Sequence, residues 1–214
     1  MSIAERLAAV RETIARACDA AGRDPASVTL VAVSKRHPAA AVLEAMAAGQ
    51  TVFGENYAQE LVEKAAAVPG ARWHFIGHLQ RNKARQVIGT GATIETVDSV
   101  RLVEELDRRA EGSLDVLLQV DVAREASKSG CAVEELPELV AAARAASKLR
   151  LRGLMTVPPA GEDPTRWFRA LRELAQAHEL PELSMGMSAD LEVAIAEGAT
   201  IVRVGTAIFG PRPS

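Results

Sequence analysis

The segment Thr-Leu-Val-Ala-Val-Ser-Lys at residues 29–35 decides how this chain is organised. Its apolar, β-branched run is typical of a parallel strand buried on both faces, and the lysine stands where that strand should end. An amine held at the rim of an apolar core is desolvated, which favours the neutral form that can attack a carbonyl and hold it as an imine. The alternative is that Lys35 only marks where the strand meets water, because most lysines are exposed.

Short apolar strands alternate with amphipathic helices along the rest of the chain. Further strands are predicted at residues 51–54, 72–76, 93–97, 115–122, 149–154, 183–185 and 200–204. Helical patterns separate these strands, and Gly49 and Gly89 are placed to end two of the helices. Eight strand–helix units at this even spacing predict an α/β fold, a single (β/α)8 TIM barrel that forms one domain over residues 1–214.

An extra helix is predicted before the first strand. Its apolar side chains recur at steps of three and four and so share one face: Ile3, Leu7, Val10, Ile14 and Ala17. Gly22 is placed to end this helix.

Composition narrows the class of ligand. The 214 residues include 25 basic and 28 acidic side chains, and the net charge of −3 gives no basic footprint for nucleic acid or a membrane surface. No apolar run is long enough to cross a bilayer. The two cysteines, Cys18 and Cys131, show no disulfide or metal-binding spacing, which predicts a reducing, cytoplasmic location. A small-molecule ligand is expected.

In such a barrel the functional residues gather at the carboxyl ends of the strands. Lys35 follows the first predicted strand, and Glu55 and Asn56 follow the second. The segments after the third, fifth and sixth strands add Gly77, His78, Gln80, the run Ser127-Lys128-Ser129-Gly130, Met155 and Thr156.

The loops after the last two strands have the composition of an anion site. Ser-Met-Gly-Met-Ser at residues 184–188 opens one helix, and Gly205 and Thr206 open a short extra one. Backbone N–H groups at helix starts attract a phosphate, glycines such as Gly186 and Gly205 let it approach, and the hydroxyls of Ser184, Ser188 or Thr206 can donate to it. Alternatively, Ser188 is an ordinary N-cap and the glycines are turn residues. Asp190 would repel an anion if its side chain faced the site.

Arg203 interrupts the last apolar strand and needs a partner there, because an unpaired buried guanidinium is very costly. Glu55, Asp121 or another strand-end acid could supply it, or a ligand could. His74 and His78 have the spacing of a helical metal pair, but the first lies in a predicted strand, so we expect no metal site.

A reactive lysine and a phosphate cradle together call for a ligand with an aldehyde and a phosphate, and pyridoxal 5'-phosphate has both. The motifs of this chain resemble the pyridoxal phosphate homeostasis protein family over nearly the whole length. They are Val-Ala-Val-Ser-Lys at 31–35, Phe-Gly-Glu-Asn-Tyr at 53–57, Trp-His-Phe-Ile-Gly-His-Leu-Gln-Arg-Asn-Lys at 73–83, Ser-Lys-Ser-Gly at 127–130, Leu-Ser-Met-Gly-Met-Ser at 183–188 and Val-Arg-Val-Gly-Thr-Ala-Ile-Phe-Gly at 202–210.

The resemblance implies a barrel like the N-terminal domain of alanine racemase, with the cofactor held as an imine on Lys35. It implies that the loop 184–188, Gly205 and Thr206 hold the phosphate and that Arg203 faces the pyridine nitrogen. The full set of expected cofactor-binding residues is Lys35, Asn56, Ser184, Gly186, Ser188, Arg203, Gly205 and Thr206.

Three functions remain open at this stage. The first, implied by the resemblance, is a non-catalytic carrier or buffer of the cofactor that affects amino-acid and keto-acid balance. For this function we expect a monomer, with pyridoxal phosphate-dependent apo-enzymes as recipients. The second is a racemase-like enzyme, which needs a second base opposite Lys35. In alanine racemases a tyrosine of another domain fills that role, whereas this chain ends after its eighth unit. The third is a cofactor-free lysine aldolase acting on a phosphorylated sugar.

Overall fold

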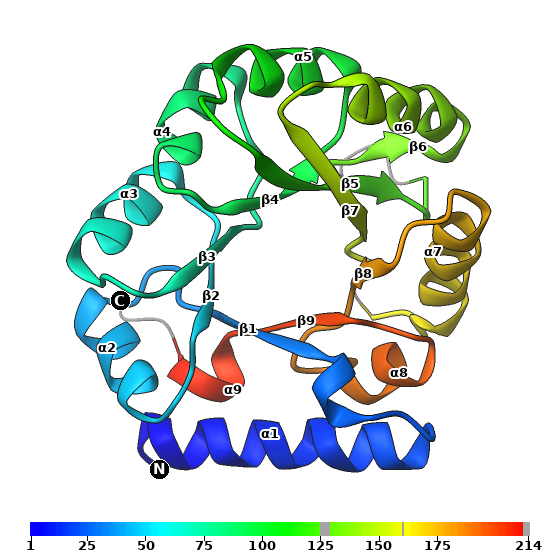
Figure 1. Cartoon of the computed structure of the whole chain (residues 1–214). Helices are drawn as coiled ribbons and strands as arrows, with labels where there is room; N and C mark the ends of the chain where they lie inside the picture. The colour runs from blue at the N-terminus through cyan, green and yellow to red at the C-terminus, as the bar shows by residue number, and fades with distance from the viewer. Residues whose placement is uncertain (125–128, 160, 212–214) are drawn as a thin grey trace.

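The computed structural model describes residues 1–124, 129–159 and 161–211. Within these ranges the strands are β1 (Thr29–Val33), β2 (Val52–Glu55), β3 (Arg72–Phe75), β4 (Thr93–Val97), β5 (Leu114–Asp121), β6 (Cys131–Ala132), β7 (Leu149–Met155), β8 (Glu182–Ser184) and β9 (Ile201–Val204). Eight of them pair in parallel in the order β4-β3-β2-β1-β9-β8-β7-β5, and β4 also pairs with β5 (Figure 1). The short β6 pairs in parallel with β5 as well. The pairing of β4 with β5 closes the predicted eight-stranded barrel, whose strands match the predicted ranges to within two residues.

The helices surround the barrel. They are α1 (Ile3–Ala20), α2 (Ala39–Ala47), α3 (Ala58–Ala67), α4 (Ala84–Ile88), α5 (Val100–Arg109), α6 (Leu136–Ala145), α7 (Thr165–Ala177), α8 (Leu191–Ala196) and α9 (Thr206–Phe209), with 3-10 turns η1 (Pro25–Ser27), η2 (Arg81–Lys83) and η3 (Val133–Glu135). In the part of the chain described, no helix is both long and apolar enough to cross a membrane.

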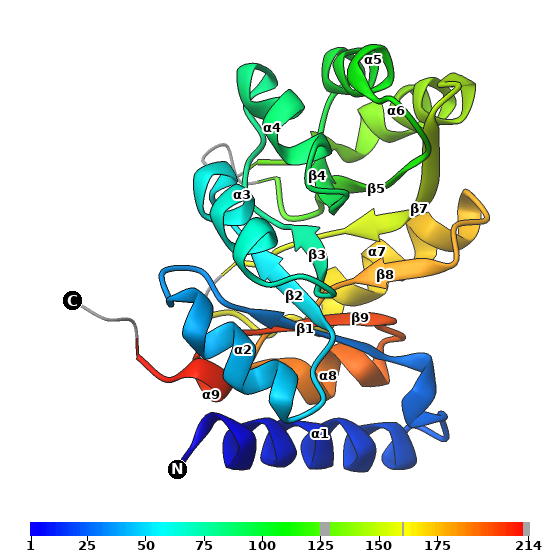
Figure 2. The same ribbon diagram turned by 60° about the vertical axis from the view of Figure 1, so that its left-hand side comes forward.

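The predicted extra helix is α1, which lies outside the ring and packs on α2, α8 and α9 (Figures 1 and 2). It begins with a capping box, in which Ser2 and Glu5 each accept a hydrogen bond from the other residue's backbone N–H. Its buried side chains are Ile3, Leu7, Val10, Ile14 and Cys18. Ala17, expected on this face, is partly buried and packs against the same core next to Cys18.

Strand alternation divides the apolar residues into two cores. Val31, Val52, Leu117, Met155 and Ile201 form a small cluster inside the barrel, whereas a second, larger cluster packs between the strands and the helices. Because side chains on a strand alternate between faces, Val33 and Lys35 continue the inward series that begins at Val31. Ser34 therefore faces outward, toward α3.

Candidate functional site

Lys35 lies at the mouth of the barrel, two residues beyond the end of β1. Its side chain is half-buried, whereas those of Val33 and Ser34 before it are buried. The neighbouring strand β9 pairs with β1 so that Val31 is opposite Arg203 and Ala32 is opposite Val204. Because Val31 belongs to the interior cluster, Arg203 opposite it also points into the barrel, at the end where β1 leads into Lys35.

Arg203 is only 4% exposed and is held by three groups. Its Nη1 donates to Ser184 Oγ at 2.6 Å and its Nη2 donates to the carbonyl oxygen of Thr156 at 2.8 Å. The nearest acid is Glu95, whose Oε2 lies 3.9 Å from Nη1. Burial lowers the pKa of Arg203, and the negative charge of Glu95 opposes this shift.

Glu55 and Asp121, the two acids named as alternative partners of Arg203, do not pair with it. Glu55 faces outward, where it contacts Ser34 and Lys64, and Asp121 accepts a hydrogen bond from the N–H of Ala123. The partner comes instead from the middle of β4, on the opposite side of the barrel. A barrel interior brings side chains of non-neighbouring strands together, and the order of residues along the chain does not reveal such pairs.

Glu95 is the functional candidate that sequence reasoning missed. It is fully buried, accepts a hydrogen bond from Ser184 Oγ at 2.5 Å on Oε2, and is joined to His74 Nδ1 at 2.5 Å through Oε1. Burial by itself raises its pKa, but the hydrogen bond and charge of His74, the charge of Arg203 and the Ser184 hydroxyl hold the pKa below its usual value. The available signal was an acid inside the apolar strand Ile-Glu-Thr-Val at residues 94–97.

His74 and His78 are not brought together around a common ligand. The first is paired with Glu95 inside the barrel, whereas the second is exposed, with its Nδ1 3.6 Å from Asp98 Oδ2. Among the described residues, no group of three or more His, Cys, Asp and Glu side chains is arranged to hold a metal ion.

The loop after β8 is built around Gly186, which has a φ of +96°. A Cβ there would lie 2.5 Å from the Cβ of Ala194, so the close packing of this loop on α8 requires glycine. The carbonyl of Gly186 accepts a hydrogen bond from the N–H of Arg203, which ties the loop to β9.

Ser188 does not cap α8, contrary to the N-cap alternative. The helix begins three residues later, and Asp190 occupies the N-cap position. The Asp190 side chain accepts a 2.5 Å hydrogen bond from the N–H of Met187 and thereby closes the turn that precedes the helix. Ser188 is exposed and Ser184 is fully buried, with its hydroxyl committed to Arg203 and Glu95.

Gly205 and Thr206 stand where β9 ends and α9 begins. A Cβ on Gly205 would lie 3.2 Å from the carbonyl oxygen of Val33, so the end of β9 runs close to the residues that precede Lys35. Thr206 is exposed at the first position of α9. The predicted short extra helix is thus present, next to the end of β1.

Asn56 directly follows β2, and the alternation of side chains along that strand directs it toward the barrel interior, as it does Val52. Its Oδ1 is buried and has no hydrogen-bond partner in the described ranges. Its backbone packs so tightly against Gly77 that a Cβ on that glycine would lie 1.9 Å from the Asn56 carbonyl oxygen. A buried, unused acceptor at the mouth is an expected feature of a site that completes its hydrogen bonds with a ligand.

The chain matches the family model "Alanine racemase, N-terminal domain" over residues 6–213. It is 50% identical to the pyridoxal phosphate homeostasis protein of Pseudomonas aeruginosa, over 99% of this chain and 96% of the relative. The chain belongs to the pyridoxal phosphate homeostasis protein family.

Solved structures of other proteins share the fold of this member of the pyridoxal phosphate homeostasis protein family. The structure of PipY from Synechococcus elongatus with pyridoxal phosphate bound is 41% identical, with a TM-score of 0.84, and the match covers 98% of this chain and all of PipY. Alanine racemase from Corynebacterium glutamicum matches with a TM-score of 0.75 at 19% identity, over 97% of this chain and 62% of the racemase. At that identity the second match concerns the fold alone.

The segment after β5 is a family motif that the structure describes only in part. Ser127 and Lys128 lie outside the described residues. The carbonyl of Ser129 accepts a hydrogen bond from Gln119 Nε2, and a Cβ on Gly130 would lie 2.7 Å from the backbone nitrogen of Asp121. The described end of the motif is therefore packed against the carboxyl end of β5, on the same rim as Lys35.

Proposed function

We propose that this protein binds pyridoxal 5'-phosphate at the carboxyl-terminal mouth of its barrel and takes part in pyridoxal phosphate homeostasis as a carrier or buffer of the cofactor. The observation that carries the proposal is the pairing of β1 with β9, which sets Arg203 beside the strand that leads into Lys35. The named relatives and the pyridoxal phosphate bound to PipY support it.

The residues at the mouth fit this cofactor. Pyridoxal phosphate supplies an aldehyde that an amine can capture reversibly, a phosphate and a ring nitrogen that accepts a hydrogen bond. Lys35 is the amine, and its bond to the aldehyde carbon would form with loss of one water molecule. Gly186, Ser188, Gly205 and Thr206 would face the phosphate, and the unused Oδ1 of Asn56 would accept a hydrogen bond at the same mouth.

Ser184 has a narrower role in this proposal than the sequence indicated. Its hydroxyl hydrogen is directed to Glu95, so it orients the Arg203 guanidinium, and any contact of this residue with a phosphate comes from its backbone. Arg203 would donate a hydrogen bond to the ring nitrogen. An arginine does not give up its proton, so it leaves the ring a weak acceptor of electrons, in keeping with storage of the cofactor.

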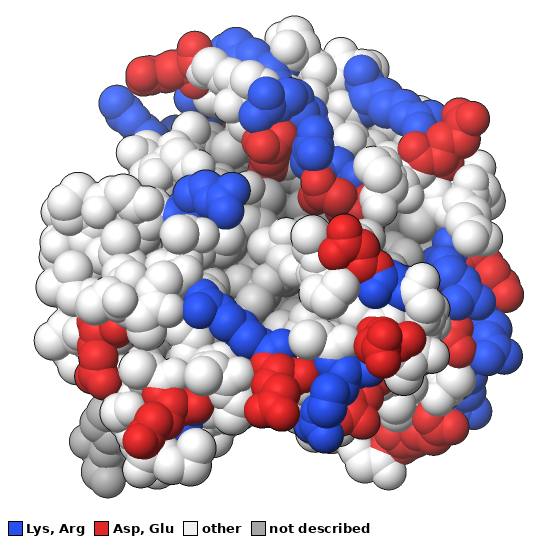
Figure 3. Space-filling model, turned by 60° about the horizontal axis from the view of Figure 1, so that its bottom comes forward, with Lys and Arg blue, Asp and Glu red and all other residues white. Residues whose placement is uncertain are grey.

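The proposal also covers catalysis, oligomeric state and partners. We propose that it has no catalytic turnover of its own, that it is monomeric, and that pyridoxal phosphate-dependent apo-enzymes are the recipients of its cofactor. Acidic and basic side chains are interspersed over the right-hand part of the face in Figure 3, and the left-hand part is largely uncharged. This pattern and the net charge of −3 favour small-molecule and protein partners over nucleic acid.

The test is an absorption titration of the purified protein with pyridoxal phosphate. We expect a visible imine band that borohydride fixes onto Lys35, located by peptide mass spectrometry. Lys35→Ala should abolish the band and leave the far-UV circular dichroism unchanged, because Lys35 stands beyond the end of its strand. Lys83→Ala, which removes an exposed lysine of η2, is the matched control. An unchanged band in Lys35→Ala would move the attachment to Lys83 or Lys128, and a colourless wild type would favour the cofactor-free aldolase.

A further inference from the structure

The turn that carries Lys35 has an unfavourable backbone conformation. The N–H of His37 donates to the carbonyl of Ser34 at 2.9 Å, which closes a four-residue turn over residues 34–37. Arg36, its third residue, has a φ of +63°, a region that side chains other than glycine rarely adopt. Since glycine would suit this position better, other contacts must hold the turn.

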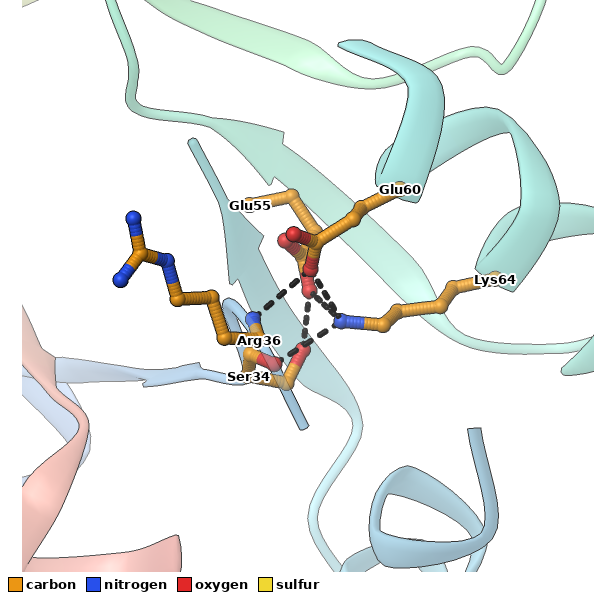
Figure 4. Close-up of polar contacts among 5 residues, drawn as sticks. All are labelled: Ser34, Arg36, Glu55, Glu60 and Lys64. Atoms are coloured by element: carbon orange, nitrogen blue, oxygen red, sulfur yellow. Dashed lines mark hydrogen bonds and ion pairs between the residues drawn. The ribbon is translucent and has the colours of Figure 1, made fainter. Parts of the chain in front are cut away.

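Those contacts come from a buried lysine on α3. Lys64 is 6% exposed, and its ammonium donates to the carbonyl oxygen of Ser34 at 2.9 Å, to Glu55 Oε1 at 2.6 Å and to Glu60 Oε2 at 3.0 Å (Figure 4). An ammonium has three donors, so all of them are used.

The two acids of this cluster also contact the turn. Glu60 Oε2 accepts the N–H of Arg36 at 2.7 Å, and Glu55 Oε1 accepts the hydroxyl of Ser34 at 2.7 Å (Figure 4). We call Ser34, Arg36, Glu55, Glu60 and Lys64 the Lys64 cluster. The carbonyl of Ser34 belongs to the peptide group before Lys35, and the N–H of Arg36 belongs to the peptide group after it. The cluster therefore holds both peptide groups that flank the Cα of Lys35.

This arrangement is costly for a purely structural ion pair. Burial raises the pKa of Glu55, against the hydrogen bonds from Lys64 and Ser34, and its second oxygen, Oε2, is buried with no partner in the described part of the chain. Buried ion pairs are weak contributors to stability, because desolvation offsets much of their attraction. Their directional hydrogen bonds can nevertheless hold a backbone in one geometry.

We propose that the Lys64 cluster is a positioning device for Lys35: it fixes the turn over residues 34–37 so that the amine of Lys35 faces the mouth. This inference rests on the proposed function, in which Lys35 is the attachment residue. Lys64 itself, Glu55 and Glu60 lie on the outer side of the strands and act through the backbone of the turn.

Glu60 gives the sharpest test, because its side chain is 27% exposed, whereas those of Glu55 and Lys64 are buried, so its loss is the least disruptive of the three. Glu60→Ala removes the acceptor of the Arg36 N–H, and Glu60→Gln restores an acceptor of the same size. Glu63→Ala is the control, because Glu63 is exposed on the same helix and its carboxylate accepts a hydrogen bond from the side chain of Gln59.

Two ligands separate positioning from general damage. Stopped-flow absorption measures imine formation with pyridoxal phosphate, and calorimetry measures binding of pyridoxine phosphate, which carries an alcohol in place of the aldehyde. Displacement of a reacting group by about 1 Å can cost on the order of 100-fold in rate. We expect Glu60→Ala to form the imine about 10- to 100-fold more slowly and to bind pyridoxine phosphate as the wild type does. Glu60→Gln should recover most of the rate, and Glu63→Ala should lose none.

The inference is overturned if Glu60→Ala forms the imine as fast as Glu63→Ala, or if it loses pyridoxine phosphate affinity in the same proportion as imine rate. Either result leaves the proposed function intact. Failure of the wild type to form an imine on Lys35 would instead reject the proposed function.

Discussion

Arg203 and Glu95 are joined through one hydroxyl: Ser184 Oγ accepts from Arg203 Nη1 at 2.6 Å and donates to Glu95 Oε2 at 2.5 Å. The three residues come from β9, β8 and β4, so the link crosses the interior of the barrel. His74 extends it by one more contact, from Nδ1 to the other oxygen of Glu95. The buried cation of Arg203 thus faces a buried acid from the opposite side of the barrel.

Glu95→Gln should destabilise the protein markedly, because it leaves the buried guanidinium of Arg203 without its counter-charge. Removing one partner of a buried ion pair costs roughly 3 to 5 kcal/mol. Urea denaturation measures the change in the free energy of unfolding. The control is Glu182→Gln, whose partner Arg152 is 47% exposed, and about 1 kcal/mol or less is expected there. Equal losses in the two variants would show that the Arg203–Glu95 link contributes little.

The same acid should make stability depend on pH. The pKa of Glu95 is lower in the folded protein than the ordinary value of 4.5, so its contribution is complete above pH 4.5 and is lost as the pH falls through the lowered folded pKa. The wild type should therefore lose more unfolding free energy on acidification than Glu95→Gln does. Denaturant titrations between pH 7 and pH 3 measure both slopes, and other carboxylates contribute equally to each. If the unfolding free energies of the wild type and Glu95→Gln fell equally with pH, the lowered pKa of Glu95 would be contradicted.

The hydroxyls of Ser188 and Thr206 are expected to strengthen phosphate binding without being needed for attachment. The double substitution Ser188→Ala with Thr206→Ala should weaken binding of pyridoxal phosphate by a few kcal/mol at most, since each charge-assisted hydrogen bond is worth about 1.5 to 3 kcal/mol and the backbone donors remain. Equilibrium dialysis gives the affinity, and Ser113→Ala, an exposed hydroxyl before β5, is the control. Unchanged affinity in the double variant would remove both hydroxyls from the site.

We expect no useful racemisation of amino acids, despite the fold shared with alanine racemases. Racemisation needs a second base on the face opposite Lys35. The chain has one tyrosine, Tyr57, which is 45% exposed at the start of α3 and accepts a hydrogen bond from Arg36 Nη2 at 3.3 Å. Incubation of the loaded protein with L-alanine and L-serine in deuterated water tests this. Deuterium incorporation with inversion, at the roughly 1 to 1,000 per second typical of enzymes, would establish the racemase alternative.

The barrel could be predicted because its signals are local. Strand alternation, helical periodicity and the glycines that end helices depend on residues a few positions apart, so eight units could be counted from the chain itself. The candidate mouth followed from one rule, that functional residues gather where parallel strands end. Lys35, Asn56, Gly186, Gly205 and Thr206 were located in this way, and their roles toward the cofactor stay predictions.

The partners of the buried charges could not be predicted, because the residues that pair are far apart in the sequence. Arg203 could be identified as a buried cation, but not matched to Glu95, because only closure of the barrel places β4 opposite β9. Lys64 has the sequence context of an ordinary helix-surface lysine, yet it is buried because α3 packs it behind the turn of Lys35. Local patterns in the chain were enough to predict the order of strands and helices and a lysine at the end of the first strand. Which charges meet depends on the folded barrel, since a buried charge takes its partner from whatever segment the fold brings within hydrogen-bond distance.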